Sequence, residues 1–241
     1  MGRKIVGVDM GGTKIHTALI CGKSIISEYI IDSPSKESEK KVVDRLIESI
    51  EMVFHPDCEG IGVGVPSIVD PKKGIVYDVF SIPSWKEVYL KEILENHFKV
   101  PVHVNNDSNC FVLGEKFFGK GEAYSNFVGI TLGTGLGSGV IIDNKLYQGV
   151  NTGAGEVGCI AHREGIIEHY CASTFFTTHG KEGQEFYEAA KNGDPKALAV
   201  FEEYGKNLSE VFKIILYAFD PQAIILGGSI SNSYEFFINA L

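Results

Sequence analysis

A short glycine-rich turn follows an apolar run of β-forming residues twice in the chain, and this repetition is the strongest constraint on its fold. Residues 9–14 (DMGGTK) come directly after residues 5–8 (IVGV), and residues 131–135 (TLGTG) come after residues 127–130 (FVGI). A second β-type run follows each turn. The two copies lie about half of the 241-residue chain apart. We therefore expect two related lobes that each contribute one turn of a size suited to phosphate.

Each turn consists mainly of residues that leave the backbone accessible. Glycine and threonine at a strand end expose several N–H groups without obstruction by Cβ, and threonine adds a hydroxyl donor. Taken singly, either turn is as typical of a plain β-hairpin, whereas their repetition favours phosphate binding. Neither turn matches GxxxxGK[ST] and no helix follows the second, so Walker and Rossmann sites are excluded. The predicted phosphate-binding residues are Gly11, Gly12, Thr13, Lys14, Gly133, Thr134 and Gly135.

Charged residues flank the first turn. Asp9 ends the preceding strand pattern, where its carboxylate is placed to orient a hydrated Mg²⁺ ion. Lys14 could pair with phosphate or with a carboxylate. The sequence thus predicts a magnesium position at Asp9 that is mediated by water.

Alternating and helical hydrophobic patterns give the order of elements. The first half reads as three strands, a helix, a strand, a helix, a strand and a final helix. The helices are expected at about residues 37–54, 88–98 and 108–118, and the strands at about 4–9, 14–21, 24–31, 60–65 and 100–104. The second half begins again with strands, continues as helices over about residues 170–219, and ends with a strand at 223–226. We expect an N-terminal lobe over residues 1–118 and a C-terminal lobe over residues 119–241.

Composition narrows the class of protein. The formal net charge of −9 argues against nucleic acid as a partner, and 44% hydrophobic residues is ordinary for a globular protein. No apolar run approaches the length of a membrane span, and a strand pattern starting at Lys4 leaves no room for a signal peptide. The five cysteines are odd in number and contain no CxxC pair, which indicates reduced thiols in a cytoplasmic protein.

Three further places could carry chemistry, and each has a structural alternative. Asp107 follows a strand and could accept a proton from an attacking hydroxyl, or it could cap the next helix. Glu156 lies in a glycine-rich loop and Glu168 follows it, so both could hold sugar hydroxyls; Glu168 could instead be a solvated helix charge. Gly227 and Gly228 could admit a nucleoside or could form a simple strand-to-helix turn.

In order, these segments resemble the ROK family of sugar kinases, within the superfamily of actin, hexokinase and heat-shock-protein ATPases. The resemblance spans essentially the whole chain. The matching segments are residues 9–14 (DMGGTK), 62–66 (GVGVP) with 69–70 (VD), 83–85 (PSW), 106–109 (NDSN) with 113–115 (LGE), 129–139, 155–158 (GEVG), Glu168 before 172–173 (AS), and 220–221 (DP) with 227–228 (GG).

The resemblance implies a fold and a set of roles. The fold would be the ribonuclease H-like, actin-like ATPase fold, an α/β architecture of two related lobes (βββαβα duplicated) around a central cleft. Asn106 would bind the sugar and Asp107 would activate its hydroxyl, while Glu156 and Glu168 would hold other hydroxyls. The two turns would take the phosphates of ATP with Mg²⁺, and Gly227-Gly228 would take the nucleoside. A homodimer is also implied as possible.

The sequence departs from the family pattern in four places. Cys159 stands where the family has a histidine, and Ser67 and Ser81 replace a glycine and an asparagine near the expected sugar. Ser67 and Cys159 are therefore candidate substrate contacts, and the replacements at Ser67 and Ser81 point away from plain glucose. The family zinc motif CxCGxxGC is absent, and the spacing of Cys159, His162, His169 and Cys171 matches no zinc pattern, so no zinc site is expected. Family members also continue beyond the position of Leu241.

The resulting hypothesis is a sugar kinase that transfers the γ-phosphate of ATP to a hydroxyl, expected at C6, of a hexose such as glucose or a related N-acetylated sugar. The alternative is a weak or inactive sugar sensor without a DNA-binding domain, because related repressors carry a helix-turn-helix before the first strand. A superfamily ATPase that holds an iron–sulfur cluster would require clustered cysteines, which the sequence lacks. Partners are expected to be sugar and ATP, with neither nucleic acid nor membrane.

Overall fold

The computed structural model describes residues 2–241, which form two compact units. The units divide between Cys110 and Phe111, inside helix α3 (Asp107–Phe118), whereas the sequence placed the lobe boundary after residue 118. The reason is that the later part of this helix packs into the second unit, where Val112 shares a buried cluster with Phe127. Each unit is therefore described by itself.

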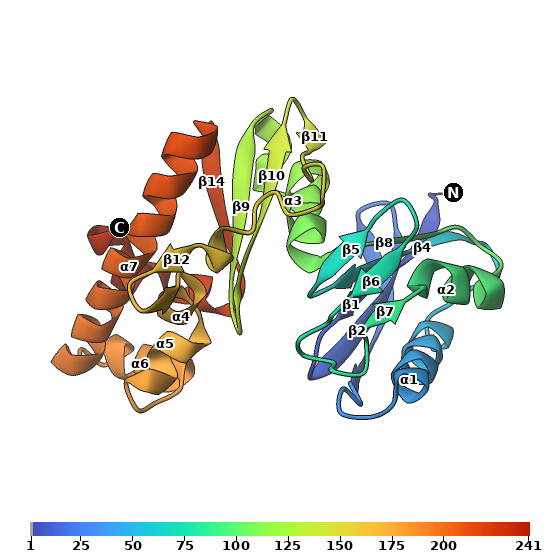
Figure 1. Cartoon of the computed structure of the whole chain (residues 1–241), viewed down its shortest axis with the longest axis horizontal. Helices are drawn as coiled ribbons and strands as arrows, with labels where there is room; N and C mark the ends of the chain where they lie inside the picture. Colours follow the sequence, from blue (N-terminus) through green and yellow to red (C-terminus); the bar gives the residue numbers. More distant parts are fainter. Residues whose placement is uncertain (1) are drawn as a thin grey trace. The chain divides into compact units, whose positions relative to one another are not determined.

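The first unit is built on a five-stranded sheet with the order β3-β2-β1-β4-β8 (Figure 1). Its strands are β1 (Lys4–Met10), β2 (Lys14–Cys21), β3 (Ser24–Asp32), β4 (Cys58–Val65) and β8 (Val102–Asn106). The first three strands form an antiparallel meander, and β4 and β8 run parallel to β1. This arrangement places the turn after β1 and the end of β8 at the same edge, because the carboxyl ends of parallel strands coincide.

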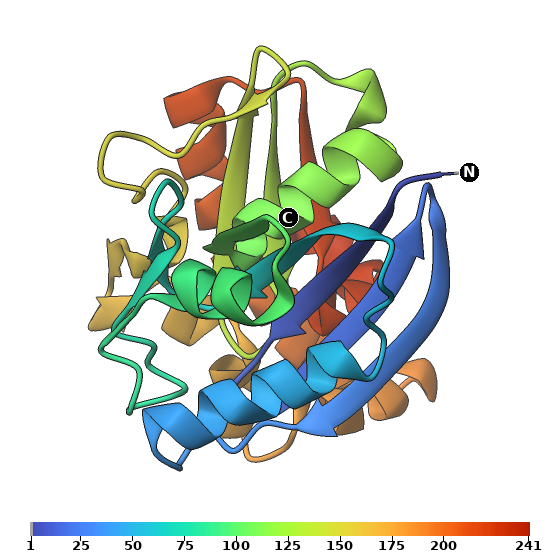
Figure 2. The same ribbon diagram turned by 90° about the vertical axis from the view of Figure 1, so that its right-hand side faces the viewer.

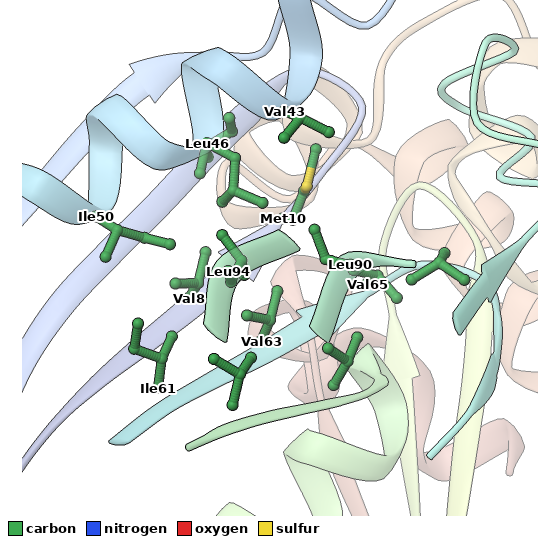
Figure 3. Packing of buried hydrophobic residues seen from close by; sticks show 14 of the residues in the cluster. Val8, Met10, Val43, Leu46, Ile50, Ile61, Val63, Val65, Leu90 and Leu94 are labelled. Carbon is green, nitrogen blue, oxygen red and sulfur yellow. The ribbon is translucent and has the colours of Figure 1, made fainter. Parts of the chain in front are cut away.

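Two helices cover one face of this sheet. Helices α1 (Glu39–Glu51) and α2 (Leu90–Phe98) place Val43, Leu46 and Leu94 against Val8 and Met10 of β1 (Figure 3). Figure 2 shows α1 in blue across the strands of the first unit. Apolar residues at intervals of three and four make α1 amphipathic, as the sequence predicted, although the helix is shorter at both ends.

The segment between β4 and α2 contains a small sheet, where the sequence predicted neither a strand nor a helix. Its strands are β5 (Ile68–Asp70), β6 (Ile75–Tyr77) and β7 (Glu87–Val88), in the order β5-β6-β7. Trp85 is fully buried beside this sheet. Strands of two or three residues are too short to show alternation, which explains why the pattern missed them.

The second unit repeats the strand arrangement of the first. Strands β9 (Phe127–Leu132) and β10 (Leu136–Ile142) form an antiparallel hairpin, and β14 (Ala223–Gly227) runs parallel to β9. A short β11 (Lys145–Leu146) completes the order β11-β10-β9-β14. The first unit pairs β1 with β2 and with β4 in the same way. In both units the glycine turn therefore connects the first two strands, which agrees with a duplicated design.

Helices lie on both faces of this second sheet (Figure 1). The long helix α7 (Pro195–Phe219) packs Leu208, Val211 and Ile215 with the residues of β9 that point to its side. The later part of α3 covers the other face, where a Cβ on Gly129 would lie 2.4 Å from Val112.

The remaining elements of the second unit are short. They are η1 (Lys120–Ala123), η2 (Val157–Cys159), β12 (Ala161–His162), β13 (Gly165–Ile166), α4 (Glu168–Cys171), α5 (Ser173–Thr178), α6 (Gly183–Lys191), η3 (Ser229–Ser233), α8 (Tyr234–Phe237) and η4 (Ile238–Ala240). None of the described helices is both long and apolar enough to cross a membrane. All five cysteines are free thiols.

Candidate active site

The first glycine turn connects β1 to β2 and leaves two backbone donors unused. The N–H of Gly11 donates to the carbonyl of Lys14 at 2.9 Å, and the N–H of Ser33 donates to the carbonyl of Thr13 at 2.8 Å. The N–H groups of Gly12 and Thr13 have no partner among the described residues. Two adjacent amides without partners, at a strand end, form a concave donor site for an anion.

The second glycine turn has the same property. The N–H of Gly133 donates to the carbonyl of Gly135 at 3.0 Å, which closes the turn between β9 and β10. The N–H groups of Thr134 and Gly135 donate to no group within residues 2–241. Both turns therefore close through the amide of their first glycine and leave the next two amides available. Phosphate binding at either turn stays a prediction.

Two carboxylates of the first unit lie near one another. Desolvation by surrounding atoms raises the pKa of Asp9, although the residue is exposed to solvent. The charge of the nearby His16 acts in the opposite direction and lowers this pKa. Burial likewise raises the pKa of Asp107, and the charge of Asp9 raises it further. A pKa raised in this way means that the surrounding cationic groups do not offset the charge. A divalent cation would supply positive charge here, and the magnesium role of Asp9 stays a prediction.

The junction between β8 and α3 contains the other predicted residues of the first unit. The Oδ1 atom of Asn106 accepts hydrogen bonds from the N–H of Ser108 at 2.9 Å and of Asn109 at 3.1 Å. Its Nδ2 donates to the carbonyl of Ser67 at 3.3 Å. Asn106 is therefore the residue whose side chain caps α3; the sequence had left open whether an asparagine or Asp107 does so.

Capping by Asn106 leaves part of Asp107 available. Asp107 Oδ1 accepts from the N–H and the hydroxyl of Ser108, at 2.7 and 3.3 Å. Its Oδ2 has no hydrogen-bond partner among the described residues. A half-buried carboxylate with one committed oxygen, one open oxygen and a raised pKa has the properties of a general base.

The two serines that depart from the family pattern both make close contacts in the first unit. The hydroxyl of Ser67 donates to the carbonyl of Tyr77 in β6, which joins the small sheet to the end of β4. A Cβ on Gly12 would lie 2.5 Å from the Cβ of Ser81, so the first turn and the loop at Ser81 touch. Ser67 and Ser81 thus lie near Asn106 and the first turn respectively.

In the second unit, Glu156, Cys159 and Glu168 form one cluster. The Cys159 thiol lies 4.0 Å from Glu156 Oε2. Partial burial, together with the charges of Glu156 and Glu168, raises the pKa of this thiol. Cys159 therefore places a thiol near Glu156 and within the electrostatic influence of Glu168, at the position where the family pattern has a histidine.

The glycines at the end of β14 have structural reasons of their own. A Cβ on Gly227 would lie 2.5 Å from the ring of Phe111, and one on Gly228 would lie 2.2 Å from the carbonyl oxygen of Leu132. Gly228 also has a φ of 83°, which glycine adopts without strain. These contacts account for both glycines through packing, and a nucleoside contact at either stays a prediction.

Comparison with known proteins assigns the chain to a family. A model of the ROK family matches residues 5–241. The chain belongs to the ROK family. The match covers both glycine turns, Asp107 and the Glu156 cluster, so the family resemblance seen in the sequence is confirmed.

Several characterised ROK proteins are similar over nearly the whole chain. The glucokinase of Thermotoga maritima is 29% identical over 272 aligned residues, which cover 99% of this chain and 86% of the relative. The xylose repressor of Bacillus subtilis is 30% identical, with 98% of this chain and 67% of the repressor covered.

Solved ROK structures share the fold. A ROK family glucokinase from Streptomyces griseus, crystallised with glucose and AMPPNP, matches with a TM-score of 0.85 at 30% identity, covering 98% of this chain and 86% of that one. The actin-like ATPase fold predicted from the sequence is confirmed.

The ROK zinc motif has no substitute in the described part of the chain. Residues 2–241 bring together no group of three histidine, cysteine, aspartate or glutamate side chains that could hold a metal ion. Cys171 is buried and its pKa is raised to about 12 by that burial, whereas Cys159 is exposed. The two thiols thus lie in different environments.

The sequence did not reveal two serines whose hydrogen bonds hold the glycine turns in place. The N–H of Ser173 donates to the carbonyl of Gly133 at 2.9 Å, and its hydroxyl donates to the carbonyl of Thr134 at 3.2 Å. Ser33 holds the first turn through its backbone N–H, which donates to the carbonyl of Thr13. Ser173 lies in the matched segment after Glu168, but bonds to backbone carbonyls leave no sequence pattern.

Proposed function

We propose that the chain is an ATP-dependent sugar kinase that transfers the γ-phosphate to a hydroxyl, at C6, of a hexose such as glucose or a related N-acetylated sugar. The observation that carries the proposal is that each unit has a glycine turn with two adjacent unpaired amides. Similarity to glucokinases along almost the whole chain supports it. The class of enzyme would be a phosphotransferase with an alcohol acceptor.

The nucleotide would be held mainly by backbone groups. The amides of Gly12 and Thr13, and those of Thr134 and Gly135, would donate to phosphate oxygens. The Lys14 ammonium, exposed and without an ion-pair partner among the described residues, would add a positive charge. In this proposal Gly227 and Gly228 would lie on the nucleoside side.

Magnesium would be held at Asp9 through water. The ion would neutralise charge on the phosphates that are transferred and released. Asp9 would orient the hydrated ion because its carboxylate is exposed and lacks a strong cationic partner.

The sugar would be activated by Asp107. Its open Oδ2 would accept the proton of the attacking hydroxyl, while Oδ1 stays bonded to Ser108 and keeps the carboxylate in one orientation. Asn106, whose amide already caps α3, would use its second Nδ2 hydrogen for the sugar. The remaining candidate sugar contacts are Ser67, Glu156, Cys159 and Glu168.

The proposal is tested by an ADP-release assay over a panel of hexoses and N-acetylhexosamines. The native chain is expected to release ADP only when a sugar is present. Asp107→Ala is expected to lower kcat by about 10²–10⁴-fold, the usual contribution of a general base. Sugar-dependent turnover that survives this substitution would remove Asp107 from its role.

A second candidate is a sugar sensor with little or no catalysis. The replacement of the family histidine by Cys159 favours it, and repressors such as the xylose repressor of Bacillus subtilis are relatives. Calorimetry that finds tight sugar binding, together with no ATP turnover at saturating sugar, would favour the sensor over the kinase.

A further inference from the structure

The carbonyl groups of the second glycine turn are all committed to partners in the same unit. The carbonyl of Gly133 accepts from the N–H of Ser173, that of Thr134 accepts from the Ser173 hydroxyl, and that of Gly135 accepts from the N–H of Gly133. Since a carbonyl and the next N–H point in opposite directions, anchoring the carbonyls on one side directs the amides to the other. The direction in which the amides of Thr134 and Gly135 point therefore depends on the groups that hold the carbonyls of the turn.

Glu168 is the second residue that contacts the turn. Its Oε2 accepts a hydrogen bond of 2.9 Å from the N–H of Leu136, the residue that follows the turn. A Cβ on Gly135 would lie only 2.6 Å from the same oxygen. The carboxylate thus fits against the backbone of the turn, and only glycine at 135 leaves space for it.

The segment that carries Glu168 and Ser173 is anchored in the core. Ile167 and Cys171 are buried, and the hydroxyl of Tyr204 in α7 donates to the carbonyl of Cys171 at 2.9 Å. A bond to a buried backbone carbonyl fixes the position of the short helices α4 and α5. Glu168 and Ser173 are therefore held at defined positions on either side of this anchor.

The same carboxylate is also close to the predicted sugar contacts. The charges of Glu168 and Glu156 both raise the pKa of the Cys159 thiol, which lies 4.0 Å from Glu156. Glu168 Oε2 thus bonds to the residue after the turn, and the charge of the same carboxylate raises the pKa of Cys159. Its Oε1 accepts none of the hydrogen bonds formed among the described residues.

We infer that Glu168 is a positioning residue for the second phosphate turn as well as a sugar contact, so that a single carboxylate couples occupancy of the sugar subsite to the geometry of the turn. The inference rests on the proposed function for the identity of both ligands. A hydroxyl bound at Oε1 restricts the carboxylate, and a restricted Oε2 restricts Leu136 and the amides of Thr134 and Gly135. By thermodynamic reciprocity, sugar and nucleotide then strengthen the binding of each other.

The test is calorimetric binding of Mg–AMPPNP, without sugar, to the native chain and three variants. Glu168→Ala removes the acceptor for Leu136 and is expected to weaken nucleotide binding about tenfold. Glu168→Gln keeps an acceptor oxygen and is expected to stay within about threefold of the native affinity. Ser173→Ala, which loses one bond to the turn and touches no predicted sugar contact, is expected to weaken nucleotide binding by about fivefold.

Sugar binding separates the two roles. Glucose, or whichever hexose supports turnover, is expected to bind Ser173→Ala with native affinity and both Glu168 variants more weakly. Saturating sugar is expected to tighten nucleotide binding in the native chain, and this gain is expected to shrink in Glu168→Gln. Circular-dichroism melts of each variant identify any loss of folding; Ser173→Ala then carries the test of support for the turn.

The outcomes distinguish this inference from the proposed function. If Glu168→Ala and Ser173→Ala both bind nucleotide like the native chain, the positioning role is wrong even where the chain is a sugar kinase. If the native chain binds nucleotide but no sugar, the proposed function fails, while the nucleotide affinities of the variants still decide whether these side chains support the turn.

Discussion

Asp107 combines a committed oxygen, an open oxygen and a raised pKa, and these properties make its ionisation measurable in two ways. Burial and the charge of Asp9 raise the pKa of its carboxyl. A base with a raised pKa becomes protonated at a higher pH, so kcat/KM is expected to fall on the acidic side above the ordinary aspartate pKa. A pH–rate profile measures this limb, and Asp107→Asn is expected to abolish it along with most of the rate.

The same shift affects stability with a defined sign. Because the folded-state pKa of Asp107 lies above its unfolded value, the folded state binds more protons between these two values, and stability falls as pH rises through this window. Asp107→Asn cannot ionise and keeps an oxygen for Ser108. It is expected to lose less stability than the native chain as pH rises from 4 to 7 in thermal melts. An identical pH dependence of the two melting temperatures would contradict the raised pKa.

Cys159 offers a test of the sugar subsite that does not depend on catalysis. The thiol is exposed, whereas Cys58 and Cys171 are 5% and 1% exposed. Alkylation by iodoacetamide, followed by peptide mass spectrometry, is expected to modify Cys159 well before these two. Its rate is expected to keep rising with pH, since partial burial and, after it, the charges of Glu156 and Glu168 raise the pKa of the thiol.

Bound sugar is expected to slow this alkylation several-fold, because in the proposed function the sugar would cover the thiol beside Glu156. Cys21, which lies in the first unit and is half-buried, serves as the internal control. Equal slowing of both thiols would indicate a general change in the protein, and no slowing of Cys159 would place the sugar elsewhere.

At the scale of elements, helix α3 begins with a cap that also orders the candidate base. Asn106→Ala loses the acceptor for the amides of Ser108 and Asn109, and we expect a loss of about 1–2 kcal/mol in the free energy of unfolding. Asn106→Asp keeps the acceptor and is expected to lose less. Trp85, the only tryptophan and fully buried in the first unit, reports urea unfolding of that unit by its fluorescence.

The comparison between these two variants is decisive for the cap. If Asn106→Ala and Asn106→Asp lose equal stability, the acceptor at Oδ1 contributes nothing. The bond from Nδ2 to Ser67, which both variants lack, would then be the stabilising contact.

Elements with a clear period were predictable from the sequence, and short ones were not. Helix α1 was expected at about residues 37–54 and spans Glu39–Glu51, because its buried positions repeat at helical spacing. Strands β5, β6 and β7 escaped prediction because two or three residues carry no period. The repeated turn predicted two related lobes, and the structure shows the pairing of β1 with β2 and β4 again in the pairing of β9 with β10 and β14.

The candidate site was predictable as a set of residues and not as a set of contacts. The sequence identified Asn106 and Asp107 but could not say which one caps α3, since either side chain can do so. It identified Gly227 and Gly228 but not the ring of Phe111 and the carbonyl of Leu132 that explain them. Ser173 was missed because its partners are backbone carbonyls, which have no letter in the sequence.

At the scale of the whole molecule, the chain consists of two units that each place a glycine turn with two adjacent amides, unpaired among the described residues, between their first two strands. Each unit adds its own carboxylates, Asp9 and Asp107 in the first and Glu156 and Glu168 in the second. Membership of the ROK family, together with this duplicated arrangement, underlies the proposal of phosphate transfer to a sugar.

The most direct test of that proposal is to follow the phosphorus atom itself. The chain is incubated with Mg–ATP and each sugar of the panel, and ³¹P nuclear magnetic resonance is recorded over time. The account predicts that the γ-phosphate signal of ATP falls while a sugar phosphomonoester signal rises in equal amount, and that Asp107→Ala greatly slows both changes. Release of inorganic phosphate without a sugar phosphate, or unchanged ATP beside a sugar that binds tightly, would contradict it.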